Sequence, residues 1–340
     1  TAACISSCMS EKQRVYKLMA DEFLILDVSS DDTKEAGKLF IKIRESIDQF
    51  VEENDFEVMY TISGGSLALH SSENIEYSKV MKLTDFSLNE AKKRGRNRCY
   101  IFDEKDYSRF IRKGEITQEL REATRNGFQG FVAFYQPVIE AKSGRLSGAE
   151  SLMRFSSSKF GMVSPVEFIP ILEETGLIIP VGRWMMKEAM EKCSQIRKVI
   201  PGFKVNINIS QVQVSKSDVI IDIADEMEKA GLSPEAMNIE LTESDLLEGD
   251  INTQHFLKEL KRMGIKLALD DFGTGYSNFH YLSELDPEII KIDRSFTSSA
   301  VADEKEYYLL KQFCRMIHNL GFYPNQNKIQ TFVIMAEQIS

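Results

Sequence analysis

The sequence predicts an α/β protein, a (β/α) barrel preceded by a smaller α+β unit. The chain has 340 residues, more than a single hydrophobic core usually serves, so two domains are expected. From residue 128 onward, short apolar runs alternate with longer segments of helical periodicity, as they do in a parallel barrel. The composition, with 43% hydrophobic and 28% charged residues, is typical of a soluble globular protein.

Residues 1–102 predict the α+β unit. Its expected elements, in order, are a hairpin over 15–28, a helix over 33–53, a strand pair over 57–69, a helix over 74–93 and a strand over 99–102. Asp21 and Glu22 fall at the turn of the hairpin, and Ser63-Gly64-Gly65 falls at the turn of the strand pair. A charged helix predicted over 103–127 then links this unit to the rest of the chain.

Residues 128–340 predict the barrel. Strands are expected at 131–139, 146–155, 204–209, 238–242, 265–270, 289–293 and 331–336, and helices at 164–175, 180–199, 217–230, 250–263 and 303–320. Gly176, Gly231, Gly264 and Gly321 sit at helix ends, as C-cap glycines do. Because this count gives seven strands, we expect the barrel to be C-terminally truncated, without its eighth strand and last helix.

Polar side chains recur where the predicted strands end. The clearest case is 266–277, where an apolar run leads into Asp270-Asp271 and a glycine-rich loop. Other predicted strands also end in polar residues. Residues spaced by two on a strand share a face, so pairs such as Asn206/Asn208 and Lys291/Asp293 should point together. The polar residues at these strand ends are Glu150, Arg154, Asn206, Asn208, Glu240, Glu243, Lys291, Asp293 and Glu337. Since such folds carry their chemistry at the carboxyl ends of the strands, we expect one site there.

The residue types at these strand ends indicate the chemistry. Oxygen ligands suit a hard ion such as Mg²⁺ or Mn²⁺, and the absence of recurring His or Cys argues against zinc. Two such ions could activate a water and stabilise the leaving oxygen in phosphoryl transfer. Arg154 would clamp a phosphate oxygen, and Lys291 would orient the attacking water or neutralise developing charge.

Residues 128 to about 323 resemble the EAL domain, the cyclic-di-GMP phosphodiesterase family. The resemblance is carried by seven motifs: Phe134-Tyr135-Gln136-Pro137, Gly148-Ala149-Glu150-Ser151-Leu152-Met153-Arg154-Phe155, Pro165…Phe168-Ile169-Pro170, Val205-Asn206-Ile207-Asn208-Ile209-Ser210, Ile239-Glu240-Leu241-Thr242-Glu243-Ser244, Asp270-Asp271-Phe272-Gly273-Thr274-Gly275 and Lys291-Ile292-Asp293. It implies a TIM-like barrel that hydrolyses cyclic di-GMP to linear pGpG with Mg²⁺ or Mn²⁺.

The resemblance also implies a role for each matching residue. Glu150, Asn208, Glu240 and Asp270 would form a first metal site, Asp271 would bridge to a second ion, and Lys291 would sit by the catalytic water. Glu243 would anchor the loop 272–277, which couples metal binding to dimerisation in the family. Gln136, Leu152 and Arg154 would touch substrate, and Asp293, which shares a strand face with Lys291, is a further candidate.

The chain departs from the EAL pattern in two places. Ser151 stands where the signature has Ala, and by strand alternation it should point away from Glu150. The family's late Ala-Glu-Gly-Val-Glu type strand end supplies another metal ligand. Here Glu337 is the favoured candidate, and an ungapped register gives Asn327 instead.

Residues 1–102 resemble the back two-thirds of a GGDEF, or diguanylate cyclase, domain. Met19-Ala20-Asp21-Glu22-Phe23 matches the family's turn of two glycines, two acids and a Phe, and Ala91-Lys92 with Gly95-Arg96-Asn97 matches a later motif. Glycines let the backbone adopt positive φ and approach a guanine closely, and Met19 and Ala20 cannot do both. We therefore expect a degenerate, partial GGDEF-like domain without cyclase activity.

Charge and composition restrict the partners. A net charge of −10 with no basic stripe argues against DNA binding. No apolar run is long enough for a membrane span, and five scattered cysteines fit a reduced, cytoplasmic setting. The expected ligand is cyclic di-GMP and the expected assembly a homodimer through the EAL domain. The alternative hypothesis is a catalytically inactive cyclic-di-GMP receptor or interaction module.

Overall fold

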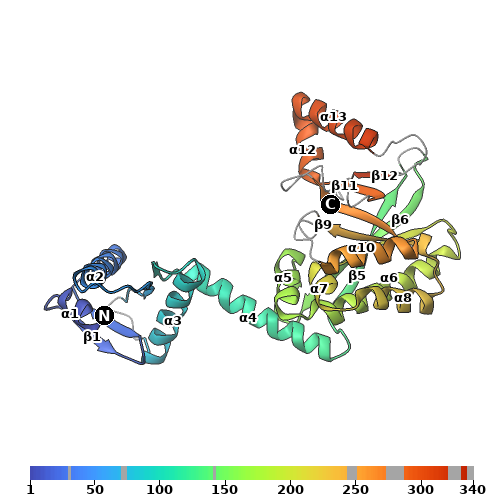
Figure 1. Cartoon of the computed structure of the whole chain (residues 1–340). Helices are drawn as coiled ribbons and strands as arrows, with labels where there is room; N and C mark the ends of the chain where they lie inside the picture. The colour runs from blue at the N-terminus through green and yellow to red at the C-terminus, as the bar shows by residue number, and fades with distance from the viewer. Residues whose placement is uncertain are drawn as a thin grey trace. The chain divides into compact units, whose positions relative to one another are not determined.

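The computed structural model describes residues 1–29, 32–69, 75–140, 143–242, 251–272, 287–320 and 331–334 (Figure 1). The chain divides into two compact units, Thr1–Gly114 and Glu115–Ser340. The division falls within helix α4 (Glu104–Arg125), in the segment for which the sequence predicts a linker. Among the described residues, no helix is both long and apolar enough to cross a membrane.

The first unit is an α+β fold with two small sheets. Its elements are α1 (Ala2–Ser7), β1 (Gln13–Lys17), β2 (Phe23–Asp27), α2 (Thr33–Glu53), β3 (Gly64–Ser66), α3 (Tyr77–Lys93) and β4 (Cys99–Ile101). Strands β1 and β2 form the expected antiparallel hairpin. Helix α1, which the sequence did not predict, packs Cys4, Ile5 and Cys8 against Ile43 and Ile47 of α2.

The strand pair predicted over 57–69 is wrong. Only Gly64–Ser66 is a strand, and it pairs in parallel with β4 rather than with a neighbouring segment. The glycines that suggested a turn serve packing instead, because a Cβ at Gly65 would lie 2.2 Å from the backbone nitrogen of Leu88 in α3. A close approach between strand and helix therefore explains a glycine that the sequence pattern assigned to a hairpin.

The second unit is built on one sheet with the strand order β12-β11-β10-β9-β8-β6-β5, and β7 lies beside β6. Its strands are β5 (Phe131–Ile139), β6 (Leu146–Ser157), β7 (Gly161–Val163), β8 (Lys204–Asn208), β9 (Met237–Thr242), β10 (Lys266–Phe272), β11 (Ile289–Ile292) and β12 (Thr331–Ile334). Its helices are α5 (Pro165–Thr175), α6 (Ile178–Arg197), α7 (Gln211–Lys216), α8 (Val219–Ala230), η1 (Pro234–Ala236), α10 (Ile251–Met263), α12 (Arg294–Ala302) and α13 (Glu304–Leu320). Each predicted strand has a counterpart.

Along the order β6-β8-β9-β10-β11-β12 the strands are parallel, but β5 and the short β7 each pair antiparallel with β6. The expectation of a purely parallel sheet is corrected here, for a topological reason. Only residues 140–145 connect β5 to β6. A parallel pair needs a crossover of a dozen or more residues, so this short connection can only form a hairpin.

Alternation along each strand separates two faces of the sheet. Helices α6, α8 and α10 lie against one face of the sheet (Figure 1). Apolar side chains at every second strand position pack against them, as Val205 and Ile207 of β8 and Ile239 and Leu241 of β9 do. The residues between them point to the opposite face. On the central strands that face carries the polar and charged side chains Asn206, Asn238, Glu240, Asp270 and Lys291. The hydrophobic core thus fixes the register that brings the polar residues together.

Candidate metal centre

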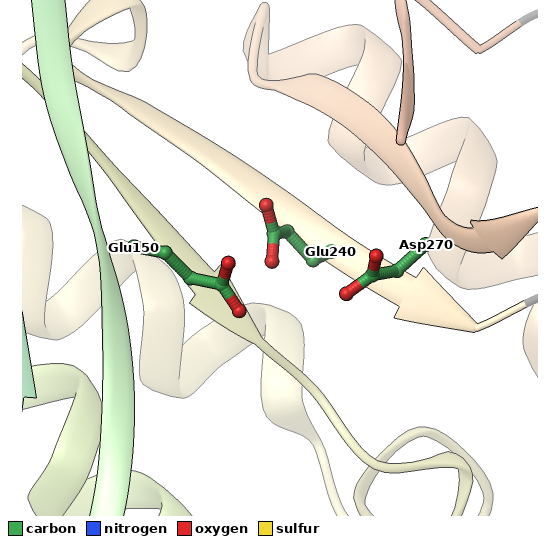
Figure 2. A group of neighbouring side chains, drawn as sticks. All are labelled: Glu150, Glu240 and Asp270. Atoms are coloured by element: carbon green, nitrogen blue, oxygen red, sulfur yellow. The ribbon is translucent and has the colours of Figure 1, made fainter. Parts of the chain in front are cut away.

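Three carboxylates from three strands meet on the inner face of the sheet. Glu150 comes from β6, Glu240 from β9 and Asp270 from β10, and Figure 2 shows their carboxylates pointing toward a common space. One oxygen of each lies within 4.8 Å of the others. Glu150 and Glu240 are 3% and 0% exposed, so their charges are held away from water. Such a group requires a cation for its stability.

Lys291 of β11 supplies a positive charge at this point. Its Nζ donates hydrogen bonds to Glu150 Oε2 (2.9 Å), Glu240 Oε2 (2.8 Å) and Asp270 Oδ2 (2.7 Å). The lysine is itself 1% exposed. An ammonium with three donors can satisfy three carboxylates at once. The sequence predicted that Lys291 belongs to the site, and the structure places its Nζ among the acids.

The pKa values of the cluster reflect burial and mutual charge. Burial raises the pKa of Glu240 to about 8, with the charges of Glu150 and Asp270 adding to the shift and Lys291 opposing it. For Lys291, burial alone would lower the pKa, but the carboxylates of Glu240, Asp270 and Glu150 together raise it above its usual value. The lysine is therefore a permanent cation in this surrounding.

Amide side chains hold the carboxylates from a second direction. Asn208 Nδ2 donates to Glu150 Oε1 at 3.0 Å, and Asn206 Nδ2 donates to Glu240 Oε1 at 2.7 Å. Asn238 Nδ2 in turn donates to Asn206 Oδ1 at 2.8 Å. Sequence reasoning noted Asn206 as a strand-end residue and missed Asn238. The available signal was a polar residue at an inner-face position of a strand that is buried on both sides.

Strand β6 contains the signature segment Gly148-Ala149-Glu150-Ser151. A Cβ at Gly148 would lie 2.4 Å from the carbonyl oxygen of Lys204, so only glycine allows this approach of β6 to β8. Ser151, which departs from the signature, donates its hydroxyl to the Asn206 carbonyl oxygen at 2.8 Å. The substitution of Ser for Ala thus adds a contact to β8 and leaves Glu150 free to face the cluster.

A β-bulge separates the two adjacent acids of β10. Leu269 pairs with Ile290 and Phe272 with Ile292, so Asp270 and Asp271 both lie opposite Lys291. Asp271 has a φ of 52°, a value that non-glycine residues rarely adopt. Its backbone N–H donates to Asp270 Oδ1 at 2.9 Å, while its side chain is exposed. The bulge aims Asp270 into the cluster and Asp271 to its rim.

The predicted substrate contacts occupy one face of the β5–β6 hairpin. Gln136 pairs with Glu150 and Phe134 with Leu152 in the antiparallel register, and Arg154 follows on the same face of β6. The Arg154 guanidinium lies 5.6 Å from the centre of the Phe134 ring. Phe134 is 50% exposed, so this face offers an open surface beside the carboxylates.

The remaining predicted site residues lie elsewhere or outside the described residues. Asp293 forms the N-cap of α12, where its side chain accepts from the Ser295 backbone N–H at 2.8 Å. Glu243, the loop 273–277, Asn327 and Glu337 fall outside the described residues, as does Gly321. The described residues form a cluster of oxygen donors around a buried cation, the ammonium of Lys291, on the inner face of the sheet. The chain is therefore an α/β protein with a candidate divalent-metal centre.

Comparison with models of known protein families identifies two of them in this chain. Residues 117–323 match the EAL domain, and residues 1–98 match the diguanylate cyclase GGDEF domain. The chain therefore belongs to the EAL-domain family, with a GGDEF-type segment ahead of the EAL domain. The resemblance predicted from the motifs is confirmed for both parts.

Individual relatives agree with this assignment. The bifunctional diguanylate cyclase/cyclic di-GMP phosphodiesterase MucR of Pseudomonas aeruginosa is 28% identical over 296 residues, 86% of this chain and 42% of MucR. Among solved structures, a MucR phosphodiesterase complex with c-di-GMP is 28% identical with a TM-score of 0.55, covering 61% of this chain and 84% of that one. The EAL enzyme Bd1971 in its cGMP-bound form is 27% identical with a TM-score of 0.59, covering 73% and 65%. This chain spans less than half the length of MucR.

Proposed function

We propose that this chain is a metal-dependent phosphodiesterase that hydrolyses cyclic di-GMP to linear pGpG. The observation that carries the proposal is the meeting of Glu150, Glu240 and Asp270 around the Nζ of Lys291. The name of MucR and the c-di-GMP bound in its phosphodiesterase structure support the choice of substrate. Since the chain spans only part of such relatives, the activity is proposed for this part alone.

The donor set fits a hard divalent ion. Three carboxylates converge from β6, β9 and β10, and they already hold one buried cation, the ammonium of Lys291. Glu150, Glu240, Asp270 and the amide oxygen of Asn208 would hold Mg²⁺ or Mn²⁺. Asp271 at the rim would help to hold a second ion, and Glu337 is proposed as a further metal ligand. When bound, the metal would supply an activated water and neutralise charge on the phosphoryl oxygens.

Lys291 has two tasks in this proposal. Without metal, its ammonium holds the three carboxyl groups together through three hydrogen bonds. During hydrolysis it remains a cation beside the reacting phosphate. There its N–H groups orient the attacking water and offset the negative charge that develops on the phosphoryl group.

The open face of β5 and β6 would bind the substrate. Arg154 would donate to a phosphate oxygen, Gln136 would offer an amide, and Leu152 would give an apolar surface; the register puts all three on one face of the hairpin. Asp293, the cap of α12, is proposed as a further substrate contact. In the reaction, water oxygen bonds to phosphorus, one P–O3′ bond breaks, and the leaving 3′ oxygen takes up a proton. The balance is one water consumed for each linear dinucleotide formed.

Further features of the resemblance belong to the same proposal. Glu243 would anchor the loop 272–277 and support a homodimer through the EAL domain. The GGDEF-like unit would carry no cyclase activity, and DNA is not an expected partner. Since all five cysteines are free, we place the reaction in the cytoplasm.

A paired measurement on the purified chain tests the function. Cyclic di-GMP binding is measured in Ca²⁺, and conversion to pGpG is then followed in Mg²⁺ or Mn²⁺. Ca²⁺ has a looser coordination geometry, so it should permit binding without efficient turnover. Binding followed by turnover supports the phosphodiesterase. Binding in Ca²⁺ with no turnover in either Mg²⁺ or Mn²⁺ would contradict hydrolysis and favour the alternative, a cyclic-di-GMP receptor.

A further inference from the structure

A ladder of amides runs across the inner face of the sheet toward the carboxylate cluster. Asn238 on β9 donates to Asn206 on β8, and Asn206 donates back to Glu240 on β9, at 2.8 and 2.7 Å. The three residues are 5%, 5% and 0% exposed. The proposed function assigns no task to Asn206 or Asn238, although Asn206 contacts Glu240 and Asn238 contacts Asn206.

We propose that Asn206, oriented by Asn238, is a positioning residue that fixes Glu240 for metal binding. The inference rests on the proposed function, because it assigns a task toward the metal that this function requires. The ladder would act through Glu240 and touch neither metal nor substrate.

The chemistry of the three groups gives the ladder a direction. Ionised Glu240, the form that binds a metal, can only accept hydrogen bonds. Asn206 must therefore turn its NH₂ toward Glu240, which leaves its Oδ1 facing Asn238. Asn238 must then also present its NH₂. Ionised Glu240 is thus compatible with only one orientation of Asn206, and the NH₂ of Asn238 stabilises that orientation by donating to Asn206 Oδ1.

The ladder holds the oxygen of Glu240 that Lys291 does not contact. Lys291 donates to Oε2, and Asn206 donates to Oε1. A metal ion that takes over the contacts of the ammonium would leave the bond to Oε1 in place. Asn206 is thus suited to keep the carboxylate in one orientation both before and after the metal binds.

Asn238 keeps Asn206 paired while one of its own atoms stays unpaired. Its Oδ1 is buried and has no hydrogen-bond partner among the described residues. A buried unpaired acceptor lowers stability, and an apolar side chain at 238 would move that penalty to Oδ1 of Asn206, which would lose its donor. The amide at 238 therefore serves to hold Asn206 in one orientation.

Two leucine substitutions test the proposal, with Mn²⁺ as the probe. Asn206→Leu removes the donor to Glu240 at similar volume. We expect the Mn²⁺ dissociation constant and kcat at saturating Mn²⁺ each to worsen about 10- to 100-fold, as for other residues that orient metal ligands, with KM for cyclic di-GMP changed less than about twofold. Asn238→Leu removes one buried unpaired acceptor and creates another at Asn206 Oδ1. Tm should therefore change little while Mn²⁺ binding weakens about 3- to 10-fold, a combination that a purely structural role would not give.

Ser151→Ala is the matched control. It deletes a buried hydrogen bond to the backbone of Asn206 without touching the side-chain ladder, and Mn²⁺ affinity should change less than about twofold. Mn²⁺ binding is measured by isothermal titration calorimetry on the full chain. If both leucine variants bind Mn²⁺ as the parent does, the positioning role is wrong. If Asn206→Leu fails to fold, Asn238→Leu alone decides in the same way. If the parent itself binds no Mn²⁺, the proposed function fails and this inference with it.

Discussion

Two turns of this chain carry adjacent acids and a non-glycine residue with positive φ, yet only one belongs to a candidate site. In the first unit, Asp21 and Glu22 follow Ala20, whose φ is 45°. In the second unit, Asp270 and Asp271 form a bulge in which Asp271 has a φ of 52°. The hairpin acids are exposed, whereas Asp270 contacts a buried lysine.

The difference lies in what the neighbouring strands bring. The hairpin β1–β2 is a two-stranded sheet of its own, so within the part of the chain that the structure describes no third strand pairs with it. The bulge of β10 lies between β9 and β11, which carry Glu240 and Lys291. A pair of acids becomes a candidate metal centre only where parallel strands end together and present complementary groups.

Removing one acid of the cluster should abolish the chemistry. We expect Glu150→Ala to eliminate metal-dependent hydrolysis of cyclic di-GMP while the fold stays intact, because Lys291 keeps Glu240 and Asp270 as partners. Conversion to pGpG is followed by chromatography, and the fold by circular dichroism. The double variant Asp21→Ala, Glu22→Ala is the control and should hydrolyse at the parent rate. Turnover by Glu150→Ala at the parent rate would show that the site is misassigned.

Removing the buried cation should destabilise the metal-free chain. In Lys291→Met, three carboxylates lose their counter-charge, so the free energy of unfolding of the second unit should fall by about 3–5 kcal/mol. Added Mn²⁺ should restore part of it by binding only the folded state. The only tryptophan, Trp184, packs against Phe128 and Phe131. Its fluorescence during urea unfolding therefore reports on the second unit.

Lys204→Met is the matched control for this substitution. Lys204 lies on β8, and burial lowers its pKa, with the nearby charges of Lys266 and Arg197 adding to the shift. Its replacement should change the free energy of unfolding by about 0.5 kcal/mol or less. Equal destabilisation by the two methionine substitutions would contradict the role given to Lys291.

The open face of β5 and β6 should determine substrate affinity. Arg154→Ala removes a charged donor proposed for a phosphate oxygen, so cyclic di-GMP binding in Ca²⁺ should weaken about 10-fold, the equivalent of about 1.4 kcal/mol. Arg183→Ala is the control, because Arg183 pairs with Asp222 on the helical side of the sheet. Unchanged affinity in Arg154→Ala would move the substrate away from this face.

The strained hairpin turn offers the smallest effect. Because glycine adopts positive φ without steric cost, Ala20→Gly should raise the stability of the hairpin by up to about 1 kcal/mol. Hydrogen exchange of the β1–β2 amides measures this change. We also expect no diguanylate cyclase activity from the variant, because Met19 still occupies the position of a signature glycine. A loss of protection in Ala20→Gly would show that the positive φ carries no strain.

Local patterns predicted much of the fold and the acids of the site. Buried strands such as Met237–Thr242 alternate two sets of side chains, so the inner position of Glu240 follows from the sequence. The hairpin at Gly64-Gly65 was mistaken because a glycine that permits helix contact looks the same as one that makes a turn. The pairing of β5 with β6 could have been predicted from the short connection.

Long-range geometry is what the sequence could not supply. Lys291 and Glu150 are 141 residues apart, and only the assembled sheet brings them to 2.9 Å. The bulge that turns Asp270 inward and Asp271 outward depends on the register of β10 with β11. Asn238 does not follow from the pattern of strand ends, because it lies one position after the start of β9. A polar residue within a buried strand indicates a hydrogen-bonded partner on a neighbouring strand.

The most direct test of the central claim is a crystal structure of the chain grown with Mn²⁺ and examined by anomalous diffraction. We expect an anomalous peak from Mn²⁺ within about 2.5 Å of oxygens from Glu150, Glu240 and Asp270. The Nζ of Lys291 should be displaced from the centre of the three carboxylates. A chain that binds Mn²⁺ elsewhere, or that keeps Lys291 hydrogen-bonded to all three carboxylates at saturating Mn²⁺, would contradict the central claim.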